Sequence, residues 1–185
     1  MQLLREKKGL SVVVTTLIIL VVSVLLATIV TLYAVNVTTT RVQEESLLVT
    51  KHHIWYNASG SWAQSAFVLV NTGGRDVVID KISVRGQECS WANVYWWKAN
   101  ETITADLAMT SDQLSGPSVS ITVQGLPRDF TQANIDVTLK SGSTMVLYIM
   151  NPDSIALNDV GTTASIAVFT ANAQYCKEAN VEAAA

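Results

Sequence analysis

The hydrophobic and polar positions divide the chain into two parts of different character. Leu10–Val35 is a run of about 26 residues in which only serine and threonine are polar, and no charged residue occurs between Lys8 and Arg41. At about 1.5 Å per residue, a helix of this length covers roughly 39 Å and can cross a bilayer core of about 30 Å. The run is too long and too free of turn residues for a strand. The pattern therefore predicts a membrane-crossing helix.

The hydroxyl groups inside this run need no partner outside the helix. Serine and threonine return their hydroxyls to a carbonyl about one turn earlier, which makes them tolerable in an apolar medium. The residues expected to do so are Ser11, Thr15, Thr16, Ser23, Thr28 and Thr31.

Apolar residues continue at helical spacing beyond the run, at Val42, Leu47, Leu48 and Ile54, among charged residues. This spacing predicts that the helix extends to residue 54 as a stalk whose apolar face packs on the following domain. The adjacent residues His52 and His53 would then point about 100° apart. We therefore interpret them as a helix end or loop rather than a metal site.

From residue 61 onward the pattern changes to strands. Apolar and polar residues alternate in short segments separated by turn residues, and no helical period recurs. Thr72–Asp76 carries two adjacent glycines and predicts a hairpin turn between its flanking strands. The predicted strands are Ala63–Asn71, Val77–Arg85, Val119–Val123, Ile135–Leu139, Met145–Asn151 and Ala164–Tyr175. The fold class expected is α+β, a long hydrophobic helix followed by an antiparallel β-sandwich.

Charge sets the orientation of the chain and limits its partners. Charged residues make up 15% of the sequence, the net charge is −3 and the pI is about 5.3. Without a basic face, a nucleic-acid partner is not expected. Arg5, Lys7 and Lys8 precede the apolar run, so the positive-inside rule places the N-terminus in the cytoplasm and the part after about Asn36 outside.

The N-terminus carries a basic pair and a glycine directly before the apolar run, Lys7-Lys8-Gly9-Leu10. A conventional secretory signal has an apolar core of about 7–15 residues, and this run is longer. The arrangement resembles the class III leader of archaeal type IV pilins and archaellins. The resemblance implies that a prepilin-type peptidase cuts after Gly9. Residues 1–9 are then the leader, 10–54 the hydrophobic helix and 55–185 the extracellular head. An uncleaved signal-anchor is the alternative.

The passages NTGGRD and NPDSIALNDVGTTASIAVFTANAQY resemble the immunoglobulin-like head of the same family. The family implies a structural, non-enzymatic subunit of a cell-surface filament, polymerised through its helix by an assembly ATPase and platform, with no cofactor. Buried methylenes contribute about 0.8 kcal/mol each relative to water. The residues expected to pack in the filament core are Leu17, Ile18, Leu20, Leu25, Ile29 and Leu32. The alternatives are an archaellin and a single-pass membrane protein whose head binds a ligand.

Cys89 and Cys176 are the two cysteines, both in the predicted outer domain. An even count at an extracellular address indicates one disulfide, with buried thiols as the alternative. Its loop of about 87 residues would stabilise the fold by roughly 4–5 kcal/mol. Three sequons make Asn36, Asn57 and Asn100 candidates for N-glycosylation, and Asn36 is the weakest because it would be buried among packed helices in a filament.

Candidate chemistry in the head is sparse. Both histidines lie at the predicted stalk end, so a Ser–His–Asp site in the head would lack its base. Asp153 and Asp159 could contribute to a calcium loop, but turn formation explains the same residues. A cluster of aromatic residues could contact a partner or a sugar, or pack within the domain. Its members are Trp91, Tyr95, Trp96 and Trp97.

Overall fold

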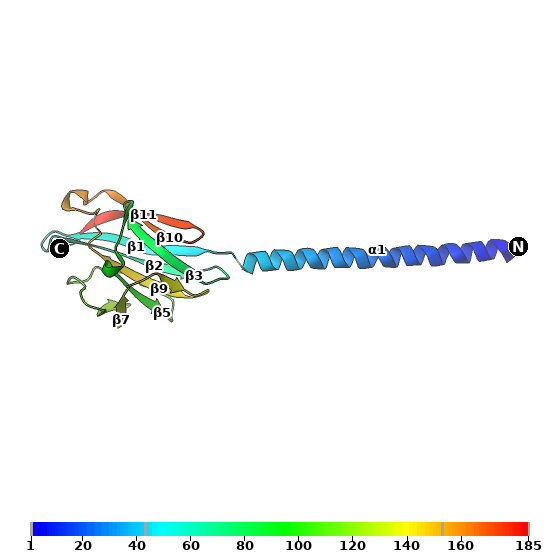
Figure 1. Ribbon diagram of the computed structural model, residues 1–185, viewed down its shortest axis with the longest axis horizontal. Helices are drawn as coiled ribbons and strands as arrows, with labels where there is room; N and C mark the ends of the chain where they lie inside the picture. Colours follow the sequence, from blue (N-terminus) through cyan, green and yellow to red (C-terminus); the bar gives the residue numbers. More distant parts are fainter. Residues whose placement is uncertain (1, 43, 153, 185) are drawn as a thin grey trace. The chain divides into compact units, whose positions relative to one another are not determined.

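The computed structural model describes residues 2–42, 44–152 and 154–184, with side chains in the helix described from residue 11 to residue 40. The chain divides into two compact units, Met1–Gln43 and Glu44–Ala185. Figure 1 shows a helix in the first unit and a β domain in the second.

The first unit is one uninterrupted helix, α1 (Gln2–Val42). The helix predicted over the apolar run is confirmed, and the hydrophobic part of it, Ser11–Thr40, is long and apolar enough to cross a membrane. It contains no proline, and backbone bonding within a helix satisfies each peptide group in an apolar medium. Every side chain described in this helix is exposed.

The predicted extension of the helix to residue 54 is wrong. The second unit begins at Glu44, and Leu47–Asn57 forms strand β1. The unit boundary therefore lies at residues 43 and 44 rather than between 54 and 55. His52 and His53 accordingly lie in a strand, not at a helix end.

In its described residues, the second unit is a mostly antiparallel β domain of eleven strands. Along the sheet the order is β4-β3-β10-β11-β1-β2-β9-β5-β7-β6, with β8 beside β3. Strand β1 runs parallel to β11, and the other pairs are antiparallel. The remaining strands are β2 (Trp62–Asn71), β3 (Val77–Val84), β4 (Gln87–Glu88), β5 (Val94–Ala99), β6 (Ser118–Val123), β7 (Leu126–Gln132), β8 (Val137–Leu139), β9 (Thr144–Met150), β10 (Thr163–Thr170) and β11 (Gln174–Ala184).

The sequence prediction was wrong about one strand pairing and about the division of one segment into strands. Strands β2 and β3 exist as expected, but β2 pairs with β1 and β9 whereas β3 pairs with β10, so the predicted hairpin between them is wrong. The single predicted strand Ala164–Tyr175 is two strands, β10 and β11, paired with each other.

The central strands bury both of their faces. In β9, Met145, Leu147 and Ile149 belong to one cluster of buried residues, and Val146 and Tyr148 belong to another. We call these the first and the second core. The first core also takes residues from β3 and β10, such as Ile82 and Ile166. The second is closed by β6, β7 and residues 100–117, the connection between β5 and β6. We call this connection the strap.

Candidate functional site

Between residues 11 and 40, α1 carries apolar residues on all sides. The six residues predicted to pack in a filament core are between 56% and 65% exposed within the chain: Leu17, Ile18, Leu20, Leu25, Ile29 and Leu32. A helix that is apolar all round is covered on all sides when it is in its functional surroundings, by lipid or by other protein. The structure thus leaves these side chains available for contacts outside the chain.

Five hydroxyl groups in the apolar run of α1 bond to the helix itself. Thr15, Ser23, Thr28 and Thr31 donate to the carbonyl four residues earlier at 2.7–2.8 Å, and Thr16 donates to the carbonyl of Val13 at 2.9 Å. The predicted return of hydroxyls to the backbone is confirmed for these five residues. The helix therefore needs no outside hydrogen-bond partner for them.

The leader residues Lys7, Lys8, Gly9 and Leu10 lie within α1. Their side chains lie outside the described residues, so the predicted cut after Gly9 stays a prediction. The apolar helix continues without interruption across this point.

A polar cluster that the sequence did not predict forms at an irregularity in β1. Lys51 and His52 together oppose the single residue Phe67 of β2, which makes a β-bulge. Lys51 has φ 50°, a left-handed conformation that costs a non-glycine residue roughly 1–2 kcal/mol. Because the extra residue reverses the alternation of the strand, His53 and Trp55 turn toward the side of the second core.

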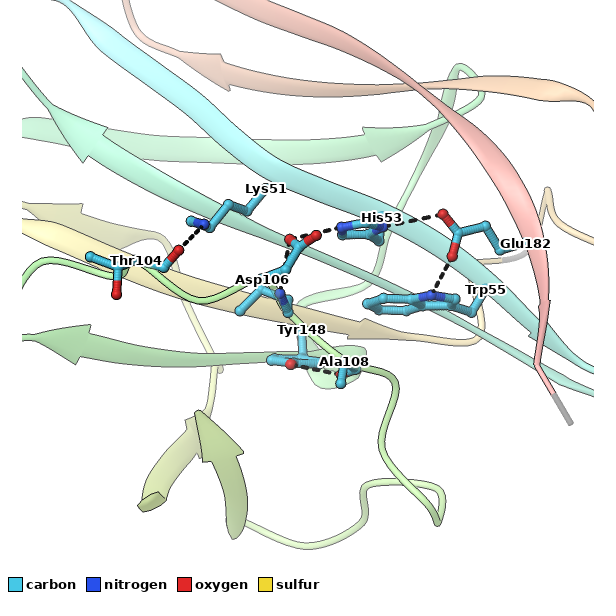
Figure 2. A network of polar contacts seen from close by, with 9 residues as sticks. Lys51, His53, Trp55, Thr104, Asp106, Ala108, Tyr148 and Glu182 are labelled. Carbon is cyan, nitrogen blue, oxygen red and sulfur yellow. Dashed lines mark hydrogen bonds and ion pairs between the residues drawn. The ribbon is translucent and has the colours of Figure 1, made fainter. Parts of the chain in front are cut away.

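His53 lies between two carboxylates from distant parts of the chain (Figure 2). Its Nε2 atom is 3.0 Å from Asp106 Oδ1 in the strap, and its Nδ1 atom is 3.3 Å from Glu182 Oε1 on β11. The imidazole stacks on the indole of Trp55, with ring centroids 5.1 Å apart and planes 6° apart. Trp55 Nε1 donates to the second oxygen of Glu182 at 3.0 Å. We call His53, Asp106 and Glu182 the latch.

Electrostatics around the latch favour the ionised form of Asp106. The hydrogen bond from His53 lowers the pKa of Asp106, and a backbone N–H from Leu107 and the charge of Lys51 act in the same direction. Lys51 Nζ donates to the carbonyl of Thr104 at 2.6 Å, which fastens the strap a second time. Burial raises the pKa of Tyr148 to about 12, and its hydroxyl donates to the strap carbonyl of Ala108 at 2.9 Å.

The two cysteines are not brought together. Cys176 on β11 lies opposite Ala167, Ala167 opposite Ser83, and Ser83 opposite Glu88, next to Cys89. Three strand spacings of about 4.8 Å place the two positions roughly 14 Å apart, whereas a disulfide needs Cα atoms within about 7 Å. Cys89 is half-buried at the first core and Cys176 is exposed. The predicted disulfide is therefore wrong for this fold.

The predicted aromatic cluster is part of the packing. Tyr95 is 2% exposed in the second core, so its prediction as a surface contact is wrong. Trp91 and Trp96 are half-buried against the first core. Trp97 is half-buried against the second, where the guanidinium of Arg128 lies 5.1 Å from its ring centroid. Packing within the domain, the alternative reading, accounts for their contacts.

The three sequon asparagines lie at different kinds of position. Asn36 is exposed on α1 and Asn100 is exposed just after β5. Asn57 ends β1, and its side-chain oxygen accepts a bond from the N–H of Gly60 at 2.8 Å. Of Asn57 and Asn100 in the β domain, Asn100 thus has the more accessible side chain. Glycosylation stays a prediction at all three asparagines.

Metal chemistry gains no support from the described residues, among which no group of three or more His, Cys, Asp or Glu side chains is placed to hold an ion. Asp153, one of the two aspartates that could contribute to a calcium loop, lies outside the described residues. Asp159 accepts the N–H of Ala156 and pairs with Arg85, and these two contacts lower its pKa. Its role in this loop is to hold the turn before β10.

The sequence matches no protein-family model and no curated protein. Among solved structures, the chain is similar to one described as the copper-bound PCuAC domain from PmoF2. The two are 16% identical with a TM-score of 0.34, over 76% of this chain and 99% of that domain. A likeness at this level carries no information on function.

Proposed function

We propose that the chain is the structural subunit of an archaeal type IV pilus-like filament at the cell surface. In this proposal the precursor is held in the membrane by α1 with its N-terminus in the cytoplasm. A prepilin-type peptidase removes residues 1–9, and an assembly ATPase and platform transfer the helix into a filament of identical subunits. The filament serves attachment, and the protein is not an enzyme.

One observation carries the proposal: between residues 11 and 40, α1 presents apolar side chains on all sides, and five of its serine and threonine hydroxyls in the apolar run bond to the helix backbone. Such a helix can lodge in lipid and equally among copies of itself. The separate β unit, which has cores of its own, supports a head that stays folded in both settings.

We further propose that the β domain is an immunoglobulin-like sandwich. The composition of the first core supports this. Strands β3 and β10 are neighbours in one part of the strand order, and β2 and β9 are neighbours in another, yet residues of all four strands pack in the first core. A sheet that folds back on itself between β10 and β2 would bring these faces together. The parallel β1–β11 pair is then the seam between the two layers.

The test is the N-terminal residue of the chain recovered from sheared cell-surface material. The proposal expects fibres that sediment and a chain beginning at Leu10, read from its intact mass. A Gly9→Val variant should keep all nine leader residues and yield no fibres. Gln2→Ala, in the same leader, serves as the matched control and should be cut normally.

Retention of Met1 in a protein confined to membranes would overturn the filament proposal. That result would favour the second candidate, a single-pass protein whose head binds a ligand, which the membrane-length helix also supports. An archaellin would give the same N-terminus as a pilin. It is distinguished by loss of swimming rather than loss of attachment when the chain is deleted.

A further inference from the structure

The latch has more acceptors than a neutral histidine can serve. A neutral imidazole has one N–H and one bare nitrogen, whereas the imidazolium has two N–H groups. Both nitrogens of His53 face carboxylate oxygens, at 3.0 and 3.3 Å. In the neutral ring, one carboxylate would therefore face a lone pair. Both contacts are favourable when the ring carries two protons.

We propose that His53, Asp106 and Glu182 form a pH-sensitive latch that holds the strap on the β domain while His53 is doubly protonated. Loss of one proton from the ring weakens one carboxylate contact and loosens the strap. The latch lies within the β domain and does not depend on whether the chain forms filaments.

Charged and titratable groups reach the latch from several elements of the β domain. The strap contributes Asp106 and β11 contributes Glu182, whereas Lys51 on β1 is the cation near Asp106. Tyr148 on β9 is neutral over the pH range concerned, because its pKa is raised to about 12. On β2, Ala66 is the residue opposite His53 and carries no charge. Two anions therefore contact the ring, and the cation Lys51 acts on Asp106.

The strap has other fastenings that do not titrate near neutral pH. Gln64 exchanges two bonds with Thr110 of the strap, its Nε2 donating at 2.8 Å and its Oε1 accepting the N–H at 2.9 Å. Gln124 Oε1 accepts the N–H and the hydroxyl of Thr104. Loosening is therefore a local opening around Asp106 rather than unfolding of the domain.

The strap covers apolar side chains that its opening would uncover. Ile103 is 7% exposed and Leu107 6%, and Met109 and Leu114 are half-buried against the second core. Because Leu107 follows Asp106 directly, release of the carboxylate frees the residue that enters the core. The β domain would accordingly present a more apolar surface above neutral pH than below it.

Hydrogen–deuterium exchange of the full-length chain in detergent micelles tests this latch. Protection factors of the strap peptide, corrected for the intrinsic pH dependence of exchange, are compared at about pH 5.5 and about pH 8, which bracket the usual titration of histidine. Because both carboxylates are exposed, we expect a modest effect, protection about three- to tenfold higher at the lower pH.

Matched variants separate the latch from general effects. In His53→Gln, the strap should be equally protected at both pH values. Its protection should be close to that of the wild type at the higher pH. His52→Gln should keep the wild-type difference, because His52 bonds to the backbone carbonyl of Glu178 instead. Gln64→Ala should lower protection at both values by the same factor.

If His53→Gln does not fold, Asp106→Asn replaces it, since this side chain is 67% exposed and leaves no cavity. Equal wild-type protection at both pH values would overturn the latch. So would a pH difference that persists without His53 or Asp106, or one that disappears in His52→Gln.

Discussion

The carbonyl oxygen of Glu44 occupies the space that a side chain at Gly73 would need: a Cβ built on Gly73 would lie 2.5 Å from it. The same Cβ would lie 2.7 Å from the backbone nitrogen of Ser46. The N–H groups of Gly73 and Gly74 donate to the carbonyls of Ser46 and Glu44. The glycine therefore allows the first residues of the β domain to lie directly on the turn after β2.

Gly73→Ala is expected to destabilise the β domain by about 2 kcal/mol, because two backbone segments would have to separate. The measurement is denaturant unfolding of the full chain in micelles, followed by tryptophan fluorescence. Gly86→Ala is the control: nothing lies within 4 Å of its Cβ, and its φ of +82° predicts a cost of about 1 kcal/mol. A smaller cost for Gly73→Ala than for Gly86→Ala would contradict the close approach.

Tyr148 makes the stability of the β domain sensitive to alkali. Its pKa is raised by burial from 10.0 to about 12, so the unfolded chain ionises first. The folded state is therefore stabilised by the protonated tyrosine. This contribution to the free energy of unfolding is complete below pH 10 and is lost as pH rises toward 12, and its size is up to about 3 kcal/mol. Tyr148→Phe should flatten this decline in unfolding free energy measured across the range. At neutral pH it should cost about 1 kcal/mol for the lost bond to Ala108. Tyr33→Phe, on α1, should leave the decline unchanged.

Asp106 gives the latch an acid limit. Its pKa is lowered by the hydrogen bond from His53. The contribution of the ionised carboxylate to holding the strap is therefore present at pH values above its ordinary pKa of 3.8 and is lost as pH falls through the lowered pKa. Strap protection should therefore fall again in strong acid, giving a maximum in weak acid. Asp106→Asn should remove this acid limb, and protection that rises steadily down to about pH 2 would contradict it.

Cys176→Ser is expected to leave the unfolding free energy unchanged, with or without a reductant. The strand order separates this position from Cys89 by three strand spacings. A disulfide closing so long a loop would contribute about 4–5 kcal/mol. A loss of that size in the oxidised protein would show that the two cysteines are bonded and that the strand order is wrong.

Leu25→Lys tests the helix. A lysine at the centre of a membrane helix costs roughly 2.5–3.5 kcal/mol on insertion scales, so less of the variant than of the wild type should be recovered in membranes. Leu25→Met preserves the apolar surface and should fractionate as the wild type does. Equal membrane recovery of both variants would show that the centre of α1 does not sit in lipid.

The apolar helix and six strands follow from local pattern, because each needs no more than a short window of sequence. These strands are β2, β3, β6, β8, β9 and β10. Strand β1 does not follow from local pattern. Leu47 and Val49 face the first core before the bulge, but after it Ile54 does, with Trp55 on the other side. The reversal breaks the alternation typical of a strand and leaves apolar spacings that match a helix.

The latch could not be predicted from the sequence for a different reason. Its members are separated by 53 and 76 residues, and the parallel pairing of β1 with β11 brings Glu182 beside them. The pairing of strands distant in the chain is not encoded in any local period. The position of Asp106 depends further on the strap, which has no regular structure between residues 103 and 109. The adjacent histidines His52 and His53 are a local feature of the sequence that could have drawn attention to this segment.

The self-contained hydroxyls of α1 have a thermodynamic consequence for growth of the proposed filament. Lipid tails and leucine side chains are about equally apolar, so moving this helix from bilayer to filament gains little from the hydrophobic effect. The same transfer also breaks none of the hydrogen bonds that these serine and threonine hydroxyls make within the helix. The exchange between the two environments is then close to balanced, and the direction is set by close packing between helices and by work done on the subunit. A subunit released at the base of such a filament could return to the bilayer and be used again.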